Sequence, residues 1–186
     1  YKLFQDYYKT AQNAKQKIIE AIAISSYSKT LKEVDARFVN LKYVNDDEFI
    51  FFSNYNSPKA NAFSEHSQIS ALMFWNSINV QIRMKASIEK TSREYNQKYF
   101  SQREKNKNAL AISSNQSNKI KSYSLIEKRY KETLESQNLS KCPDYWGGFS
   151  FKPYYFEFWE GHEFRLNKRD VYEIDNGNWK HTILEP

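Results

Sequence analysis

Short β-rich segments, separated by turns and a few helices, run through most of this chain of 186 residues. Residues 36–44 and 48–53 are two such segments, and Asn45-Asp46-Asp47 between them has the composition of a turn. Near the end, Asn176-Gly177 indicates a hairpin, because Asn and Gly tolerate the positive φ angles of a type I′ turn. Roughly six to nine strands at this spacing predict a mainly β, α+β fold: a small antiparallel, Greek-key-like barrel with helices packed outside it.

The length fits one domain spanning residues 1–186. Apolar side chains at helical spacing predict an N-terminal helix over 3–20. Barrel strands are expected in two blocks, at about 21–90 and about 148–184, and the polar, charged stretch at about 92–138 predicts a helical insert between them. In the second block we expect strands at 148–152, 154–159, 164–167, 171–174 and 179–184.

Glycine is scarce enough to exclude two kinds of phosphate site. Only four glycines occur, at 147, 148, 161 and 177, and they lack the spacing of a Walker loop or of a GxGxxG dinucleotide fingerprint. A lone cysteine, Cys142, excludes a disulfide framework within the chain. The histidines, at 66, 162 and 181, show no metal-ligand spacing, so no metal site is expected.

Charge and hydropathy narrow the range of partners. No segment reaches the ~18 unbroken apolar residues of a membrane span, and no signal peptide is recognised, so we expect a cytoplasmic protein without a membrane partner. The net charge of +6 and the 17% aromatic content also suggest a non-enzymatic basic module for nucleic acid. Its cations are dispersed and no binding motif occurs, so no nucleic-acid partner is expected.

Two candidate anion sites lie in the first half of the chain. On a strand, Arg37 shares a face with Val39 and Leu41, where an arginine is unfavourable unless it meets an anion; the alternative is an arginine that reaches solvent at a strand end. At Ser57-Pro58 a strand passes into a predicted helix start close to Lys59, where free N–H groups favour an anion. The alternative there is ordinary helix capping.

Two further candidates lie in the second half. Tyr99, Arg103 and Lys107 are spaced i, i+4, i+8, so on one continuous helix they share a face suited to a phosphate ester, or form a solvated cationic face. Arg165 and Arg169, together with Trp159, could line a site for an anionic aromatic ligand. The alternative is a sheet core, because aromatic residues at alternate positions, as around these arginines, are typical of one.

Taken together and in order, several motifs resemble the pyridoxamine 5′-phosphate oxidase family from Leu3 to Pro186. The motifs are Arg-x-Val-x-Leu-Lys at 37–42, Asn-Tyr-x-Ser-x-Lys at 54–59, the strand around Gln81, Lys-Tyr-Phe…Arg at 98–103, Gln116-Ser117, Trp-Gly-Gly-Phe at 146–149, Glu-Phe-Trp-x-Gly at 157–161, Arg-Leu-x-x-Arg at 165–169 and a terminal Leu-x-Pro.

The resemblance implies an FMN-binding split β-barrel that works as a homodimer, with FMN at the subunit interface. It also implies oxidation of a phosphorylated vitamin B6 substrate, pyridoxine or pyridoxamine 5′-phosphate, to pyridoxal 5′-phosphate, with O2 as the electron acceptor. In this interpretation Arg37 and Lys59 neutralise the FMN phosphate, Ser53 and Ser117 donate hydrogen bonds, and hydride transfer is mainly the chemistry of the cofactor.

Residue by residue, the resemblance assigns two sets. The cofactor set is Arg37, Phe38, Val39, Asn40, Leu41, Lys42, Phe52, Ser53, Lys59, Gln81, Gln116, Ser117, Trp159 and Arg169. The substrate set is Lys42, Tyr99, Arg103, Lys107, Arg165 and Asn167. Arg165, which would lie over the substrate, is the candidate catalytic residue.

The chain also departs from the family pattern, mostly on the substrate side. Pro58 stands where a second arginine is expected, Lys107 replaces a serine, Asn167 replaces a histidine and Lys168 reverses the sign of the next residue. The segment Leu110-Ala111-Ile112 replaces Gly-Ala-Trp. These changes support an alternative in which the fold and the flavin are kept but a different aromatic compound is the substrate.

Overall fold

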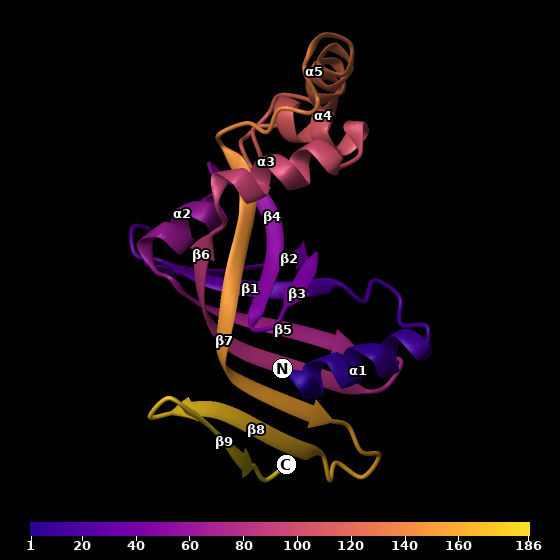
Figure 1. Ribbon diagram of the computed structural model, residues 1–186, viewed down its shortest axis with the longest axis vertical. Helices are drawn as coiled ribbons and strands as arrows, with labels where there is room; N and C mark the ends of the chain where they lie inside the picture. Colours follow the sequence, from indigo (N-terminus) through magenta and orange to yellow (C-terminus); the bar gives the residue numbers. More distant parts are fainter.

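The computed structural model describes residues 1–186 and is mainly antiparallel β-sheet with five helices (Figure 1). The strands are β1 (Ala21–Ser28), β2 (Glu33–Asn40), β3 (Tyr43–Asn45), β4 (Glu48–Asn54), β5 (Gln68–Trp75), β6 (Val80–Lys90), β7 (Trp146–Glu160), β8 (Lys168–Asp175) and β9 (Asn178–Ile183). The helices are α1 (Lys2–Asn13), α2 (Pro58–Glu65), α3 (Arg93–Gln102), α4 (Lys105–Ser113) and α5 (Tyr123–Ser136). The predicted mainly β, antiparallel α+β class is confirmed.

Strand β7 is the spine of the sheet, whose order is β2-β1-β5-β6-β7-β4-β3. Residues 146–151 of β7 pair with β4 and residues 155–160 pair with β8, while β6 lies along the other side of both parts. Pro153 lies between these two pairings, next to a β-bulge opposite Lys85 and Ala86. A proline without an N–H is tolerated where the ladder changes partner, so the expected strands at 148–152 and 154–159 are one strand.

The core sits inside the sheet and is closed at one end by α1. Strand β5 alternates exposed and buried residues along its whole length, as a half-buried strand does. From α1, the buried Phe4 packs edge-on against Phe49 at 4.9 Å between ring centroids and also against Trp75. This packing explains why the N-terminal amphipathic stripe forms a helix here.

Three sequence-based boundaries are wrong. The first helix ends at Asn13 rather than at residue 20, because Lys15 and Ile18 adopt left-handed φ angles of 56° and 52°. The predicted strand 36–44 is interrupted at Leu41-Lys42, whose N–H groups bond outside the β2 ladder, to Glu20 and Ile50. The expected strand at 164–167 is a turn between β7 and β8.

The helices after β6 lie together at one end of the molecule, and the β8–β9 hairpin lies at the other (Figure 1). The hairpin turn is the predicted one, with φ angles of 48° at Asn176 and 81° at Gly177. No helix is both long and apolar enough to cross a membrane.

Candidate functional site

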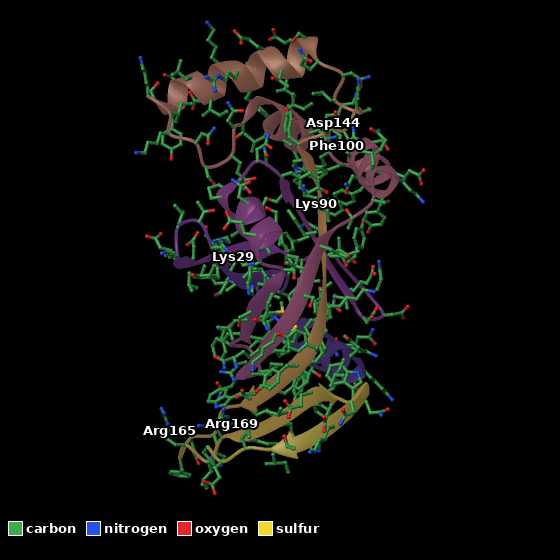
Figure 2. All side chains as sticks on the ribbon, turned by 90° about the vertical axis from the view of Figure 1, so that its left-hand side faces the viewer. Lys29, Lys90, Phe100, Asp144, Arg165 and Arg169 are labelled. Carbon is green, nitrogen blue, oxygen red and sulfur yellow. The ribbon has the colours of Figure 1, made fainter.

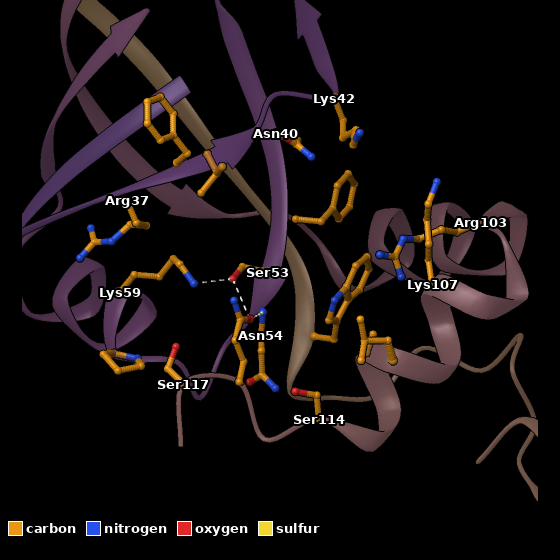
Figure 3. A pocket seen from close by; sticks show the side chains of 18 of the residues that line it. Arg37, Asn40, Lys42, Ser53, Asn54, Lys59, Arg103, Lys107, Ser114 and Ser117 are labelled. Carbon is orange, nitrogen blue, oxygen red and sulfur yellow. Dashed lines mark hydrogen bonds between the residues drawn. The ribbon is translucent and has the colours of Figure 1, made fainter. Parts of the chain in front are cut away.

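A cavity of about 720 Å³ opens where the ends of β2 and β4 meet the start of α2 and the helices α3 and α4. This volume is within the range of small-molecule sites, roughly 300–1,000 Å³. Most of the predicted cofactor and substrate residues line it (Figure 3). They are Arg37, Phe38, Val39, Asn40, Lys42, Phe52, Ser53, Lys59, Tyr99, Arg103, Lys107, Gln116 and Ser117.

Lys59, in the first turn of α2, is a buried cation at one end of the cavity. Its side chain is only 8% exposed, and its Nζ donates hydrogen bonds to Ser53 Oγ at 3.2 Å and, at 3.5 Å, to Ser57 Oγ. No carboxylate forms an ion pair with it. Burial lowers the pKa of Lys59, and the charge of Arg37 lowers it further. An uncompensated buried charge is unfavourable, so this position favours an anionic ligand.

Arg37 lies on β2 at the same end, partly buried rather than extended into solvent. Its Nη1 donates to Ile24 O at 3.1 Å and Ser26 Oγ at 2.8 Å, and its Nη2 forms an ion pair with Asp35 at 2.5 Å. Asp35 also lines the cavity, and the hydrogen bond from Arg37 holds the pKa of this exposed carboxyl below its usual value. Since β1 and β2 already fix the guanidinium, Arg37 is in place before any ligand arrives.

The turn between β4 and α2 is held by polar side chains rather than by simple capping. Ser57 is the N-cap of α2, but its hydroxyl donates back to Asn54 O at 2.7 Å instead of capping the helix. Gln116 Oε1 accepts from Ser53 Oγ at 3.3 Å and from the Asn54 N–H at 3.2 Å, which ties the segment after α4 to β4. Ser117 next to it has a left-handed φ of 70°. This turn therefore brings Ser53, Lys59 and Ser117 to one end of the cavity.

The other end of the cavity has a second group of cations, Lys42, Arg103 and Lys107, above an aromatic floor (Figure 3). Tyr99 stacks on Phe52 with 3.7 Å between ring centroids. The Arg103 guanidinium lies 5.1 Å from the ring centroid of Trp146, and its Nη1 donates to Asn108 Oδ1 at 3.1 Å. Burial lowers the pKa of Arg103, although an arginine stays charged.

The condition under which Tyr99, Arg103 and Lys107 would share a face, one continuous helix, is not met. Helix α3 ends at Gln102, Arg103 is extended, and α4 begins at Lys105. The break is held by Asn108, which is buried and whose Nδ2 donates to Phe100 O at 2.7 Å and Leu139 O at 2.8 Å. The three side chains nevertheless line the same cavity, because the break turns α4 toward it.

A second group of predicted residues lies far from the cavity. Gln81, Trp159 and Arg169 are register partners on β6, β7 and β8, and we call them the C-terminal row. Arg165 is exposed in the turn after β7, with a left-handed φ of 66°, and Asn167 Oδ1 in this turn accepts from the His162 N–H. Figure 2 shows Arg165 and Arg169 at the opposite end of the molecule from Phe100.

Some cavity residues were not selected from the sequence, and one selected residue, besides those of the distant group, lies outside the cavity. Asp35 lies two positions before Arg37 on the same strand face, and this spacing could have indicated that it lines the cavity. Trp146 belongs to the Trp-Gly-Gly-Phe motif, which could have indicated it as well. Asn54 opens the Asn-Tyr-x-Ser-x-Lys motif, whereas Ser114 carried no separate signal. Leu41, assigned to the cofactor set, is instead buried in the core.

Comparison with known proteins identifies the family. A family model described as pyridoxamine 5′-phosphate oxidase matches residues 20–137. A second model, described as the pyridoxine 5′-phosphate oxidase C-terminal dimerisation region, matches residues 146–186. The chain belongs to the pyridoxamine 5′-phosphate oxidase family.

Relatives named pyridoxine/pyridoxamine 5′-phosphate oxidase support this assignment. The one from Hydrogenovibrio crunogenus is 36% identical over 98% of this chain and 86% of its own length. The one from Aliarcobacter butzleri is 33% identical over 100% of this chain and 89% of its own. The family resemblance stated from the sequence is therefore confirmed.

Solved structures confirm the split β-barrel fold. PhzG from Burkholderia lata, in complex with tetrahydrophenazine-1-carboxylic acid, has a TM-score of 0.93 at 24% identity and covers 100% of this chain and 91% of its own. A pyridoxamine 5′-phosphate oxidase-related, FMN-binding protein from Nostoc punctiforme has a TM-score of 0.77 at 10% identity, with 98% and 97% coverage.

In this pyridoxamine 5′-phosphate oxidase family member, the departures from the family pattern fall in both regions. Pro58, Lys107, Leu110 and Ala111 line the cavity, and Asn167 lies in the distant turn. Lys107 Nζ forms an exposed ion pair with Glu104 at 2.6 Å, so part of its charge is already compensated.

Proposed function

We propose that this chain is an FMN-dependent oxidase that converts pyridoxamine or pyridoxine 5′-phosphate to pyridoxal 5′-phosphate with O2 as the acceptor. The observation that carries the proposal is a single cavity with two cationic ends across an aromatic floor. Lys59 and Arg37 form one end, and Lys42, Arg103 and Lys107 form the other. Two phosphorylated ligands bound side by side match this distribution of charge.

The Lys59 end fits the phosphate of FMN. A buried ammonium without a carboxylate partner needs an anion, and Ser53 and Ser117 add hydroxyl donors beside it. Side chains thus take the place of the glycine-rich loop that the chain lacks. When bound, FMN would supply a hydride acceptor, and the protein would hold the flavin ring and the substrate ring next to each other in the orientation that the transfer needs.

The Arg103 end fits the phosphate of the substrate. Arg103 is held by Trp146 and Asn108 and lacks a carboxylate partner, so its remaining N–H groups are free for an oxyanion. Tyr99 offers a phenol donor, and Lys42 and Lys107 add charge. Lys107 retains hydrogen-bond donors where the family pattern has a serine, which keeps phosphate binding feasible.

We propose further that the complete site forms in a homodimer, with Arg165, Asn167 and the C-terminal row contributed by the second copy. Within one chain none of these residues lines the cavity, and Figure 2 shows Arg165 and Arg169 at the opposite end of the molecule from Phe100. The match of residues 146–186 to a dimerisation region supports this arrangement. Phe38, which lines the cavity, is 75% exposed in the single chain and would be covered by a second copy in this arrangement.

The experiment is a visible spectrum of the purified protein reconstituted with FMN, followed by anaerobic mixing with pyridoxamine 5′-phosphate. We expect flavin absorbance that bleaches with the substrate, then returns with release of hydrogen peroxide when O2 is admitted. Failure to bind FMN would refute the flavin assignment. Bound flavin that neither vitamer phosphate reduces would refute the substrate assignment alone.

A second candidate is an FMN-dependent oxidoreductase that acts on a different aromatic compound. Its support is the similarity to PhzG, whose structure holds a carboxylated ring compound, together with the altered cavity wall at Leu110 and Ala111. Reduction of bound flavin by a dihydroaromatic carboxylic acid, without reduction by either vitamer phosphate, would favour this candidate.

A further inference from the structure

Glu157, in the middle of β7, is a carboxylate only 3% exposed that has no role in the function proposed above. Both of its oxygens are occupied. Oε1 accepts from Arg169 Nε at 2.9 Å and Nη2 at 2.8 Å. Oε2 pairs with Arg83 Nη2 at 2.7 Å and accepts from the Tyr155 hydroxyl at 3.1 Å. A buried carboxylate is tolerated in a protein when it is compensated in this way.

The strand register places this carboxylate beside the C-terminal row. Glu157 is the register partner of Arg83 on β6, and two residues further on Trp159 is the partner of both Gln81 and Arg169. Residues two apart on a strand share a face, so Glu157 and Trp159 point to the same side of β7. The ion pair between Glu157 and Arg169 therefore joins this face of β7 to the neighbouring strand β8.

The charges leave Arg169 available to a ligand. Two arginines share one carboxylate, so the cluster of Arg83, Glu157 and Arg169 has a net charge of +1. A guanidinium has five N–H groups. Three of those of Arg169 are used, two by Glu157 and one by Glu185 O at 3.0 Å. The others remain for an acceptor, and the orientation of the planar group is fixed by the three bonds already made.

We propose that Glu157 is a positioning residue for flavin binding: it orients the guanidinium of Arg169 toward the FMN held in the cavity of the second copy. Arg83 and Tyr155 in turn fix the carboxylate. The inference rests on the proposed function, because it requires that FMN binds and that the C-terminal row of one chain contacts it.

The test is Glu157→Gln, with the FMN dissociation constant of the full-length protein measured by quenching of flavin fluorescence. Glutamine keeps the size but loses the charge and presents an amide N–H group to an arginine. We expect FMN to bind about ten-fold more weakly, which corresponds to one charge-assisted contact. The control is Glu173→Gln on β8, an exposed carboxylate without an ion pair, which should leave the dissociation constant unchanged.

A double-mutant cycle separates positioning from a general structural role. In an Arg169→Ala background, Glu157→Gln should change FMN affinity by less than about two-fold, because the group it orients is gone. A full ten-fold effect in that background, or wild-type affinity in the single variant, would overturn the inference while the proposed function stands. Wild-type protein that fails to bind FMN refutes the proposed function itself.

Tyr155→Phe keeps the inference testable if Glu157→Gln does not fold. This change removes one of the donors to the carboxylate and leaves both arginines. We expect FMN binding about three-fold weaker, in line with one hydrogen bond. Unchanged affinity in a folded Tyr155→Phe protein would overturn the proposal.

Discussion

Lys59 and Arg103 in the cavity are held in the opposite way to Arg169 in the C-terminal row. In the cavity, Lys59 is buried without a carboxylate partner, and Arg103 is held by an aromatic ring and an amide. In the row, Arg169 is already paired with Glu157. The cavity therefore has charge that only a ligand can compensate, and we expect it to supply most of the binding free energy. Arg169 is largely compensated within the chain, although its cluster keeps a net charge of +1, so the row contributes orientation more than affinity.

The largest effect should come from removing the uncompensated charge with Lys59→Met. The variant loses a buried cation and its hydrogen bond to the ligand phosphate, so we expect FMN to bind on the order of 100-fold more weakly. Fluorescence titration of the protein with FMN measures this change. Lys131→Met on the exposed face of α5 is the matched control and should bind like wild type. A loss of less than about three-fold in Lys59→Met would place the binding free energy elsewhere.

The same variant has a pH signature in the protein without FMN. The pKa of Lys59 is lowered below 10.5 in the folded chain, mainly by burial. Between that lowered pKa and 10.5 the unfolded chain binds more protons, so the free energy of unfolding rises as the pH rises through this window. Urea unfolding at a series of pH values should show a shallower rise in Lys59→Met. An equal slope would contradict an uncompensated charge at this position.

Mixing two defective chains tests whether the two regions meet across a dimer. Lys59→Met damages the cavity, and Arg165→Ala removes the exposed candidate catalytic arginine of the distant turn, so each alone should turn over poorly. If one site takes its cavity from one chain and Arg165 from the other, half of the randomly formed dimers have one intact site. Co-refolding equal amounts should then restore about a quarter of the wild-type activity. No recovery would mean that both regions serve one site within one chain.

The fold was largely predictable because its signals are local. The strand expected at 48–53 is β4, within one residue of its bounds, and the Asn176-Gly177 turn follows from the φ angles it requires. The end of α1 was missed because non-glycine residues, Lys15 and Ile18, take the left-handed conformations that end it. The strand expected at 164–167 failed for a similar reason, as Arg165 is left-handed.

The membership of the site was more predictable than its arrangement. Family motifs selected most of the residues that line the cavity, but the motif order gives no sign that Gln81, Trp159 and Arg169 lie apart from the others. The placement of α4 after the break at Arg103 was also hidden. It depends on Asn108, one of whose acceptors is Leu139, 31 residues further along the chain. Such a contact follows from tertiary packing and not from local periodicity.

Asn108→Ala tests how firmly the cavity holds Arg103. Loss of the amide frees the guanidinium, removes one of the two donors to Phe100 O, and leaves the half-buried Leu139 O without its side-chain donor. We expect stability to fall by about 1–3 kcal/mol and the KM for the phosphorylated substrate to rise about ten-fold. FMN affinity should stay near wild type, because the Lys59 end is untouched. Asn106→Ala, exposed on the same helix, is the control. Equal losses in FMN and substrate binding would show that the two ends are not independent.

The smallest effect should come from Tyr99→Phe, which removes a single hydroxyl at the substrate end. The ring should keep its stacking on Phe52, since phenylalanine has the same shape, so the cavity floor is retained. Losing one hydrogen bond to the substrate phosphate predicts a KM about three-fold higher with FMN affinity unchanged. Tyr95→Phe is a matched control, because Tyr95 also stacks beside Phe52, at 6.2 Å, but does not line the cavity.

The pH dependence of that variant decides what the hydroxyl does. Burial, and then the neighbouring Tyr43, raises the pKa of Tyr99 above its ordinary value of 10.0. The phenol is therefore neutral and able to donate throughout the neutral range, and the ratio of wild-type to Tyr99→Phe kcat/KM should not change with pH there. A ratio that changes with pH would mean that Tyr99 exchanges a proton during the reaction. The cavity would then take part in the chemistry, beyond the binding role that its unpaired charges assign to it.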